Sequence, residues 1–352
     1  MKGWIVGLFD DEPENARSKI IAICVVLVTA NILAWIWALI AFREYPILLG
    51  TALLAYTFGL RHAVDADHIA AIDNVARKLT QMQKRPISVG LFFSLGHSTI
   101  VVLASIFVAL TMNALQIGLG NLKEIAGVVG TSMSMFFLLT VAGANILVLI
   151  SVVRIFGRVR RGEHFLEEDL NVLLSQRGFL GRRLRSLFAI ISRTWHMYPL
   201  GILFGLGFDT ASEIGLLGIS AAQGTQGLSM WSILVFPALF TAGMSLVDTI
   251  DGALMVGIYG WAFVKPVRKL YYNITITSVS VIVALVVGGI EALGLLDNKV
   301  GPDGGNWKLV HALNENFGAL GYLLIGIFVV CWLISMAIYR YNGYGKIDVR
   351  TR

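Results

Sequence analysis

The chain has 352 residues, of which 56% are hydrophobic and only 14% are charged, and its mean hydropathy is +0.74. This composition excludes an ordinary soluble domain and indicates an integral membrane protein. The two cysteines, Cys24 and Cys331, lie in apolar runs near opposite ends of the chain, which excludes a disulfide scaffold and a thiolate metal cluster.

A sliding window of about 19 residues predicts eight transmembrane helices. The first follows a polar, acidic start and is too long for the apolar segment of a cleaved signal peptide, so we expect it to be retained. The sequence therefore predicts an all-α integral membrane protein with one membrane domain over residues 1–352. In chain order the predicted helices are roughly 20–42, 47–72, 87–112, 127–152, 197–222, 231–260, 270–296 and 318–340.

Basic residues gather in every second connection between these helices. They include Arg77 and Lys78 after the second helix, many residues of the long connection 153–196, and Lys265 after the sixth helix. The positive-inside rule then predicts that this long loop and both termini lie in the cytoplasm. The formal net charge of +6 reflects this topology, and nucleic acid is not an expected partner.

An internal repeat relates two parts of the chain. FGLRHAVDADH, from Phe58, aligns with FGLGFDTASEI, from Phe204, at an offset of 146 residues, and FSLGHS aligns with FTAGMS at an offset of 147. The second and fifth helices cross the membrane in opposite directions, which predicts an inverted repeat of helices 2–4 (about 47–152) and 5–7 (about 197–296). Secondary transporters often follow this plan, with the substrate bound near the midplane. Chance similarity between apolar, glycine-rich segments is the alternative explanation.

Ionisable residues at similar depth in four predicted helices form the candidate site. A charge near the bilayer centre costs at least about 2.5 to 3.5 kcal/mol, so several of them indicate a function. Acidic residues outnumber Arg61, and imidazole beside carboxylate without thiolate favours nickel, cobalt, zinc or copper(II). His62, His97, Asp209 and Asp248 lie near the helix centres, and Asp65, Asp67, His68, Glu213 and Asp251 lie within roughly two turns of them.

Ideal helix geometry separates the two aspartates of the second helix. His62, Asp65 and His68 share a sector about 120° wide, whereas Asp67 points elsewhere. His62 and His68 are about 9 Å apart along an ideal axis, so joint binding of one ion requires local unwinding or a bound position that shifts. Simpler roles remain open: His97 is suited to an interhelical hydrogen bond, and the aspartates to pairing with Arg61 or to helix capping.

Four segments of the chain resemble the signature segments of the NiCoT family of nickel/cobalt transporters. They are RHAVDADHI (61–69), FSLGHSTIVV (93–102), LGFDTASEI (206–214) and GMSLVDTIDG (243–252). The resemblance implies eight transmembrane helices and high-affinity uptake of Ni²⁺ or Co²⁺ across the cytoplasmic membrane. It also implies that His62, Asp67, His68 and His97 belong to the metal path, with Asp209, Glu213, Asp248 and Asp251 as acidic positions of the second half.

The sequence thus predicts a metal permease and not an enzyme, with the metal as transported substrate, no cofactor, and the lipid bilayer as surroundings. No GxxxxGK[ST] phosphate-binding loop is present, which argues against ATPase machinery, and the membrane potential alone could concentrate a divalent ion. Export in place of uptake, a membrane metalloenzyme and a metal sensor remain as alternatives. The choice between nickel and cobalt, any co-transported ion and the number of subunits are left open.

Overall fold

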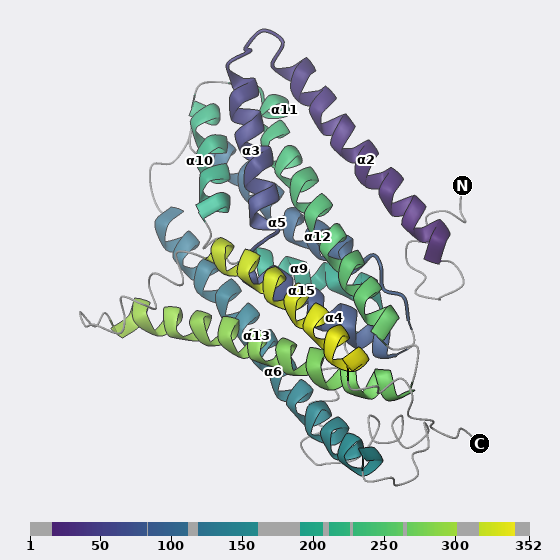
Figure 1. The fold of residues 1–352 in the computed structure, drawn as a ribbon. Helices are drawn as coiled ribbons and strands as arrows, with labels where there is room; N and C mark the ends of the chain where they lie inside the picture. Colours follow the sequence, from purple (N-terminus) through teal and green to yellow (C-terminus); the bar gives the residue numbers. More distant parts are fainter. Residues whose placement is uncertain are drawn as a thin grey trace.

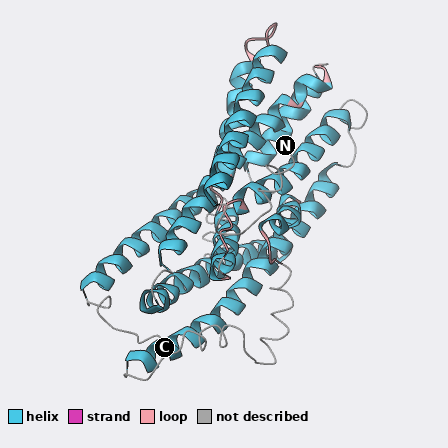
Figure 2. Ribbon diagram, turned by 90° about the vertical axis from the view of Figure 1, so that its right-hand side faces the viewer, coloured by secondary structure: helices cyan, strands magenta, loops and turns pink. Residues whose placement is uncertain are grey.

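The apolar stretches of the sequence form long helices in the computed structural model (Figure 1). The structure describes residues 16–82, 84–111, 119–160, 191–206, 211–225, 228–262, 266–300 and 317–341. Regular structure within these ranges is helical, and they contain no strand (Figure 2). Five helices in the described ranges are long and apolar enough to cross a membrane: Arg17–Ala41, Val89–Leu110, Ser134–Arg154, Met230–Tyr259 and Thr277–Leu296.

The first predicted helix corresponds to α2 (Ala16–Ala41), and the second to two shorter helices, α3 (Leu48–His62) and α4 (Ala66–Gln81). The fifth is likewise divided, into α9 (Met197–Gly205) and α10 (Ala211–Thr225). The remaining helices are α5 (Val89–Thr111), α6 (Leu119–Arg160), the 3-10 turn η2 (Thr194–His196), α11 (Met230–Ile233), α12 (Val235–Ala262), α13 (Pro266–Val300) and α15 (Phe317–Tyr341).

The break between α3 and α4 corrects the prediction of one continuous helix over 47–72. Asp65, the residue before α4, has φ −67° and ψ 147°, an extended conformation that interrupts the helical hydrogen bonding. Asp67 lies in the first turn of α4, and its Oδ1 accepts a hydrogen bond from the backbone N–H of His68 at 2.8 Å. A carboxylate in this place satisfies a free N–H group and interacts favourably with the positive end of the helix dipole.

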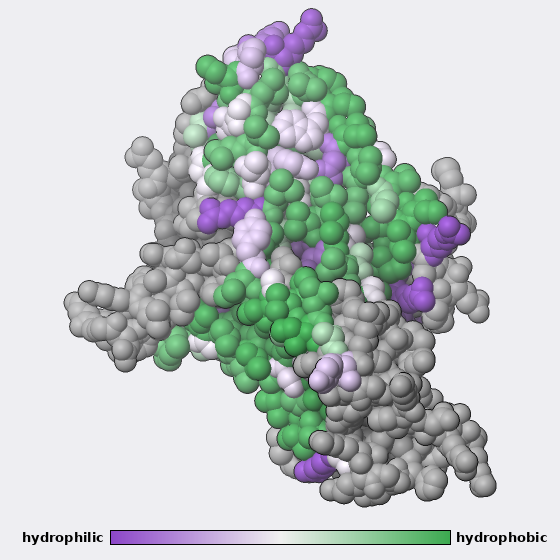
Figure 3. Space-filling view, in the orientation of Figure 1, coloured by the Kyte–Doolittle hydropathy of each residue, from purple (hydrophilic) through white to green (hydrophobic). Residues whose placement is uncertain are grey.

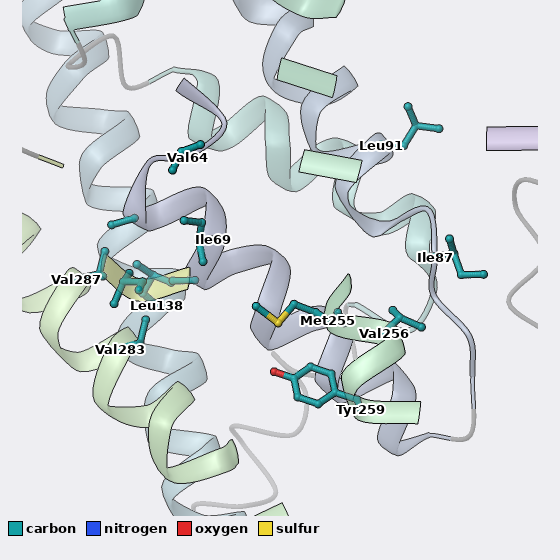
Figure 4. Packing of buried hydrophobic residues seen from close by; sticks show 14 of the residues in the cluster. Val64, Ile69, Ile87, Leu91, Leu138, Met255, Val256, Tyr259, Val283 and Val287 are labelled. Carbon is teal, nitrogen blue, oxygen red and sulfur yellow. The ribbon is translucent and has the colours of Figure 1, made fainter. Parts of the chain in front are cut away.

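One apolar cluster surrounds α4 and packs it against α6, α12, α13 and α15. Ile69 of α4 lies near Leu138 of α6 and Val283 and Val287 of α13, and Met255 of α12 contributes to the same cluster (Figure 4). Their burial removes apolar surface from water and contributes roughly 1.5 to 3 kcal/mol for each large side chain. This cluster fixes the helix that begins at the candidate site.

Apolar side chains also cover much of the outer surface (Figure 3). On α2, which lies along the outside of the bundle (Figure 1), Ile21, Val28, Leu33 and Ile40 are exposed. A soluble monomer rarely exposes so continuous an apolar surface. The exposed side chains together with the five apolar helices are consistent with an integral membrane protein.

The position of Arg77 differs from the prediction, which placed this residue in a loop. It lies inside α4, and only 1% of its surface is exposed. Its charge predicted a loop between two helices, because stretches rich in lysine and arginine usually lie outside the membrane, on its cytoplasmic side. In the structure this guanidinium is buried between helices instead.

Candidate metal site

Three buried histidines form the centre of the site. His62 ends α3, His68 lies in the first turn of α4, and His97 lies in the middle of α5. Their ring centroids are 4.7 to 4.8 Å apart in all three pairs, and one nitrogen of each ring lies within 4.8 Å of the others. The exposed fractions are 2%, 0% and 3%, so the cluster is closed to solvent.

The break in the helix is what brings His62 and His68 together. On one continuous helix they would be about 9 Å apart along the axis, whereas their ring centroids are 4.7 Å apart across the turn at 63–65. The local unwinding that joint binding requires is therefore present in the structure.

Glu213 supplies a carboxylate to the same point. Its Oε1 is 2.8 Å from His97 Nε2 and 3.7 Å from His62 Nε2, and the two Nε2 atoms are themselves 2.9 Å apart. Glu213 lies in the first turn of α10 and is 1% exposed. Two nitrogens and an oxygen from three helices thus converge on one small volume.

Two aspartates hold the outer nitrogens of the histidines. Asp65 Oδ2 is 3.0 Å from His62 Nδ1, and Asp248 Oδ1 is 3.3 Å from His68 Nδ1. Contacts of this kind fix the orientation of an imidazole ring. His68 Nε2 is buried and has no hydrogen-bond partner among the described residues.

The remaining predicted residues make no hydrogen bond to an imidazole among the described residues, or lie outside these residues. Asp67 is half-buried, and its Oδ1 accepts a hydrogen bond from the His68 backbone N–H. Asp251 is 9% exposed, and its Oδ2 has no hydrogen-bond partner in the described part of the chain. Arg61 is exposed, so it does not serve as the buried partner of Asp248. Asp209 lies outside the described residues.

Close contacts between helix backbones hold the site elements in place. Gly59 of α3 packs on the backbone carbonyl of Phe240 in α12, and Gly201 of α9 packs on that of Phe93 in α5. A side chain at either glycine would overlap backbone atoms. The same two phenylalanines approach the histidines, with Phe93 edge-on to His68 at 4.8 Å and Phe240 5.5 Å from His62.

A second buried polar group was not predicted. Asp73, Asn74 and Arg77 of α4 bond to side chains of α6, α12 and α13. The sequence does show Asp73 as an unusual charge in an apolar segment, since it ends the same stretch that contains His62 and His68. Its partners were not identifiable, because they lie up to 207 positions away.

Comparison with known proteins identifies the family. The family model of high-affinity nickel-transport proteins (NicO) matches residues 48–338. A high-affinity nickel transport protein of Cupriavidus necator is 58% identical over 346 residues, which is 98% of this chain and 99% of that protein. The hydrogenase nickel incorporation protein HupN of Bradyrhizobium diazoefficiens is 53% identical over 314 residues, covering 89% of this chain and 82% of that protein.

A cobalt transport protein, NhlF of Rhodococcus rhodochrous, is 42% identical over 291 residues and covers 81% of both chains. No solved structure matches the chain. With a model match over most of its length and relatives similar from end to end, the chain belongs to the family of high-affinity nickel-transport proteins.

Proposed function

We propose that this protein carries Ni²⁺ or Co²⁺ into the cell and binds the ion between α3, α4, α5 and α10. The observation that carries the proposal is the convergence of His62 Nε2, His97 Nε2 and Glu213 Oε1 in a closed, water-excluded site. The names of the relatives, which include nickel and cobalt transporters, support the choice of substrate.

The distances suit a small divalent ion. With metal–ligand bonds of about 2.1 Å, two ligands at a right angle are about 3.0 Å apart. The separations of 2.9 Å and 2.8 Å around His97 Nε2 match this spacing, and right-angled coordination by nitrogen and oxygen suits Ni(II). Two ligands on opposite sides of the ion would be about 4.2 Å apart. The ligand nitrogens of the three histidines are separated by up to 4.8 Å, so a pair at that separation has to move slightly closer when the ion binds.

The ligand roles follow from these positions. His62, His97 and Glu213 hold the ion directly, and His68 joins them with its buried Nε2. Asp65 and Asp248 orient His62 and His68. Asp67, Asp209 and Asp251 then belong to the path along which the ion arrives or leaves, where their charge offsets that of the cation.

The architecture that we propose has eight transmembrane segments, both termini in the cytoplasm and an inverted repeat over about 47–152 and 197–296. Both halves begin with a divided helix, and the acids in the first turns of α4 and α10, Asp67 and Glu213, are 146 positions apart. The packing is reciprocal, since α3 contacts α12 while α9 contacts α5. An inverted repeat produces such crossed pairs.

Neutral imidazoles would replace water around the metal, and movement of one repeat against the other would alternate access. A divalent ion gains roughly 4.6 kcal/mol on crossing a potential of 100 mV, negative inside, which favours uptake. Export is less favoured, because one close relative is named for nickel incorporation into hydrogenase, which calls for metal inside the cell.

Transport into proteoliposomes tests the proposal. Nickel should accumulate when the interior is made negative, and cobalt should compete with it. The His62→Ala variant, reconstituted in equal amount, should lose accumulation. Equal uptake by this variant would show that the ion uses another site, and accumulation only against the potential would support export.

A further inference from the structure

We infer that Asp73, Asn74 and Arg77 form a latch that closes the metal site on the α4 side and opens for each ion that passes. The latch comprises these three residues and their partners Asn145, Tyr259, Thr277 and Ser280. The inference rests on the proposed transport function, because a site that only stores metal has no need to open.

The latch links α4 to three other helices through hydrogen bonds. The Tyr259 hydroxyl of α12 and the Ser280 hydroxyl of α13 both donate to the Asp73 carboxylate, the latter at 2.7 Å. Arg77 donates from one terminal nitrogen to Thr277 Oγ1 of α13 at 3.1 Å and from the other to Asn74 Oδ1 at 3.2 Å. Asn145 of α6 donates to the same Asn74 oxygen at 2.7 Å.

A permanent contact does not require these groups. The apolar cluster around Ile69 and Val283 already packs α4 on the same helices. Burying a guanidinium and a carboxylate costs desolvation energy that apolar side chains of similar size avoid. Polar groups lower the cost of separating an interface, because water forms new hydrogen bonds with them once they are exposed.

Other interfaces around the histidines are built to stay closed. Gly96 of α5 packs on the backbone of Tyr198 in α9, and Gly59 of α3 packs on that of Phe240 in α12. Separation there would open tight, largely apolar contacts. Since the histidines are nearly fully buried, some interface has to open, and the hydrogen-bonded face of α4 is the one suited to do so.

The latch also lies on the helix that carries a metal-site residue. His68 and Asp73 are both on α4, about 7.5 Å apart along an ideal helix axis. The polar groups therefore continue from the histidine cluster toward the latch. An ion that leaves along α4 meets Arg77 unless the latch is open.

Metal-binding kinetics of the purified protein test the latch. The Thr277→Val and Ser280→Ala variants each remove one of its hydrogen bonds without touching a metal-site residue. We expect Ni²⁺ release into excess chelator, followed by stopped flow, to be roughly tenfold faster, as the loss of one hydrogen bond to a charged group predicts. Association should accelerate by the same factor, so the Kd should stay within about twofold, because opening precedes both steps.

The matched control is Ser94→Ala, which removes the 3.0 Å hydrogen bond between Ser94 of α5 and Ser245 of α12. Its rates should stay within about twofold of the wild type. Unchanged rates in both latch variants would overturn the inference, and so would a weaker Kd caused by faster release alone, which indicates a positioning role. Failure of the wild type to bind nickel would instead contradict the proposed function. The two variants break separate bonds, so poor folding of one leaves the other as the test.

Discussion

His62 and His97 meet Nε2 to Nε2 at 2.9 Å, although 35 positions and a change of helix separate them. For this contact to be a hydrogen bond, one of the two nitrogens has to carry a proton, and the tautomers decide which one. Because metal ligands must be deprotonated, Ni²⁺ bound at the proposed site would displace that proton. The pair therefore already has the spacing of two adjacent ligands on one ion.

Replacing either histidine should abolish high-affinity binding. We expect His62→Ala and His97→Ala to weaken Ni²⁺ binding at least about 100-fold, more than the 10- to 100-fold loss usual for groups outside the first coordination shell. Isothermal titration calorimetry of the purified protein measures this. The control is His196→Ala, since His196 is half-buried and accepts a hydrogen bond from the Ser192 backbone at 3.2 Å, away from the site. Equal losses in all three variants would indicate general destabilisation.

Neutralising Glu213 should weaken the site through charge alone. Glu213→Gln keeps the size of the side chain but removes the negative charge beside His97, so we expect at least about tenfold weaker Ni²⁺ binding. Glu291→Gln is the matched control, because Glu291 is also a buried carboxylate and contacts Ser134 Oγ at 2.7 Å in another part of the bundle. If Glu213→Gln binds as tightly as the wild type, the carboxylate is not a ligand.

The two aspartates beside the helix break should behave differently. Asp65→Asn weakens the contact that orients His62, and we expect roughly 10- to 100-fold weaker metal binding. Asp67→Asn leaves an amide oxygen to accept from the His68 N–H, so its binding should change by less than about fivefold, since Asn replaces Asp well at helix starts. Titration of both proteins with Ni²⁺ gives the comparison. A larger loss of Ni²⁺ affinity in Asp67→Asn than in Asp65→Asn would indicate that Asp67 binds the metal and that Asp65 does not contribute.

The positions of the long helices and of the histidines followed from sequence, because apolar length and buried charge are local signals. The break after His62 was not predicted as such, because the apolar run over 47–72 indicated one helix. Ideal geometry indicated only that joint binding of one ion by His62 and His68 needs local unwinding or a bound position that shifts. The ideal helix angles that separated Asp65 from Asp67 do not apply across the break, because Asp65 itself has an extended backbone conformation. Which of the two aspartates contributes to metal binding stays a prediction.

Pairings across the fold could not be obtained in the same way. His68 and Asp248 are 180 positions apart, and Tyr259 and Asp73 are 186 apart. Such contacts depend on how helices pack, which one sequence does not reveal. Arg77 was misplaced for a related reason: a charge next to Lys78 predicts a loop, whereas its hydrogen bonds to Thr277 of α13 and Asn74 of α4 make its burial tolerable.

Two glycines of α3 offer a final test of the close packing that supports the site. A methyl group at Gly59 would overlap the Phe240 carbonyl, whereas nothing lies within 4 Å of the corresponding point at Gly50. We expect Gly59→Ala to destabilise the protein by about 1 to 3 kcal/mol or more, because α3 and α12 must move apart. Gly50→Ala should stabilise it by about 0.5 to 1 kcal/mol, since alanine favours a helix interior. Thermal unfolding of both variants in detergent measures the difference, and a lower midpoint for Gly50→Ala than for Gly59→Ala would contradict the tight contact between α3 and α12.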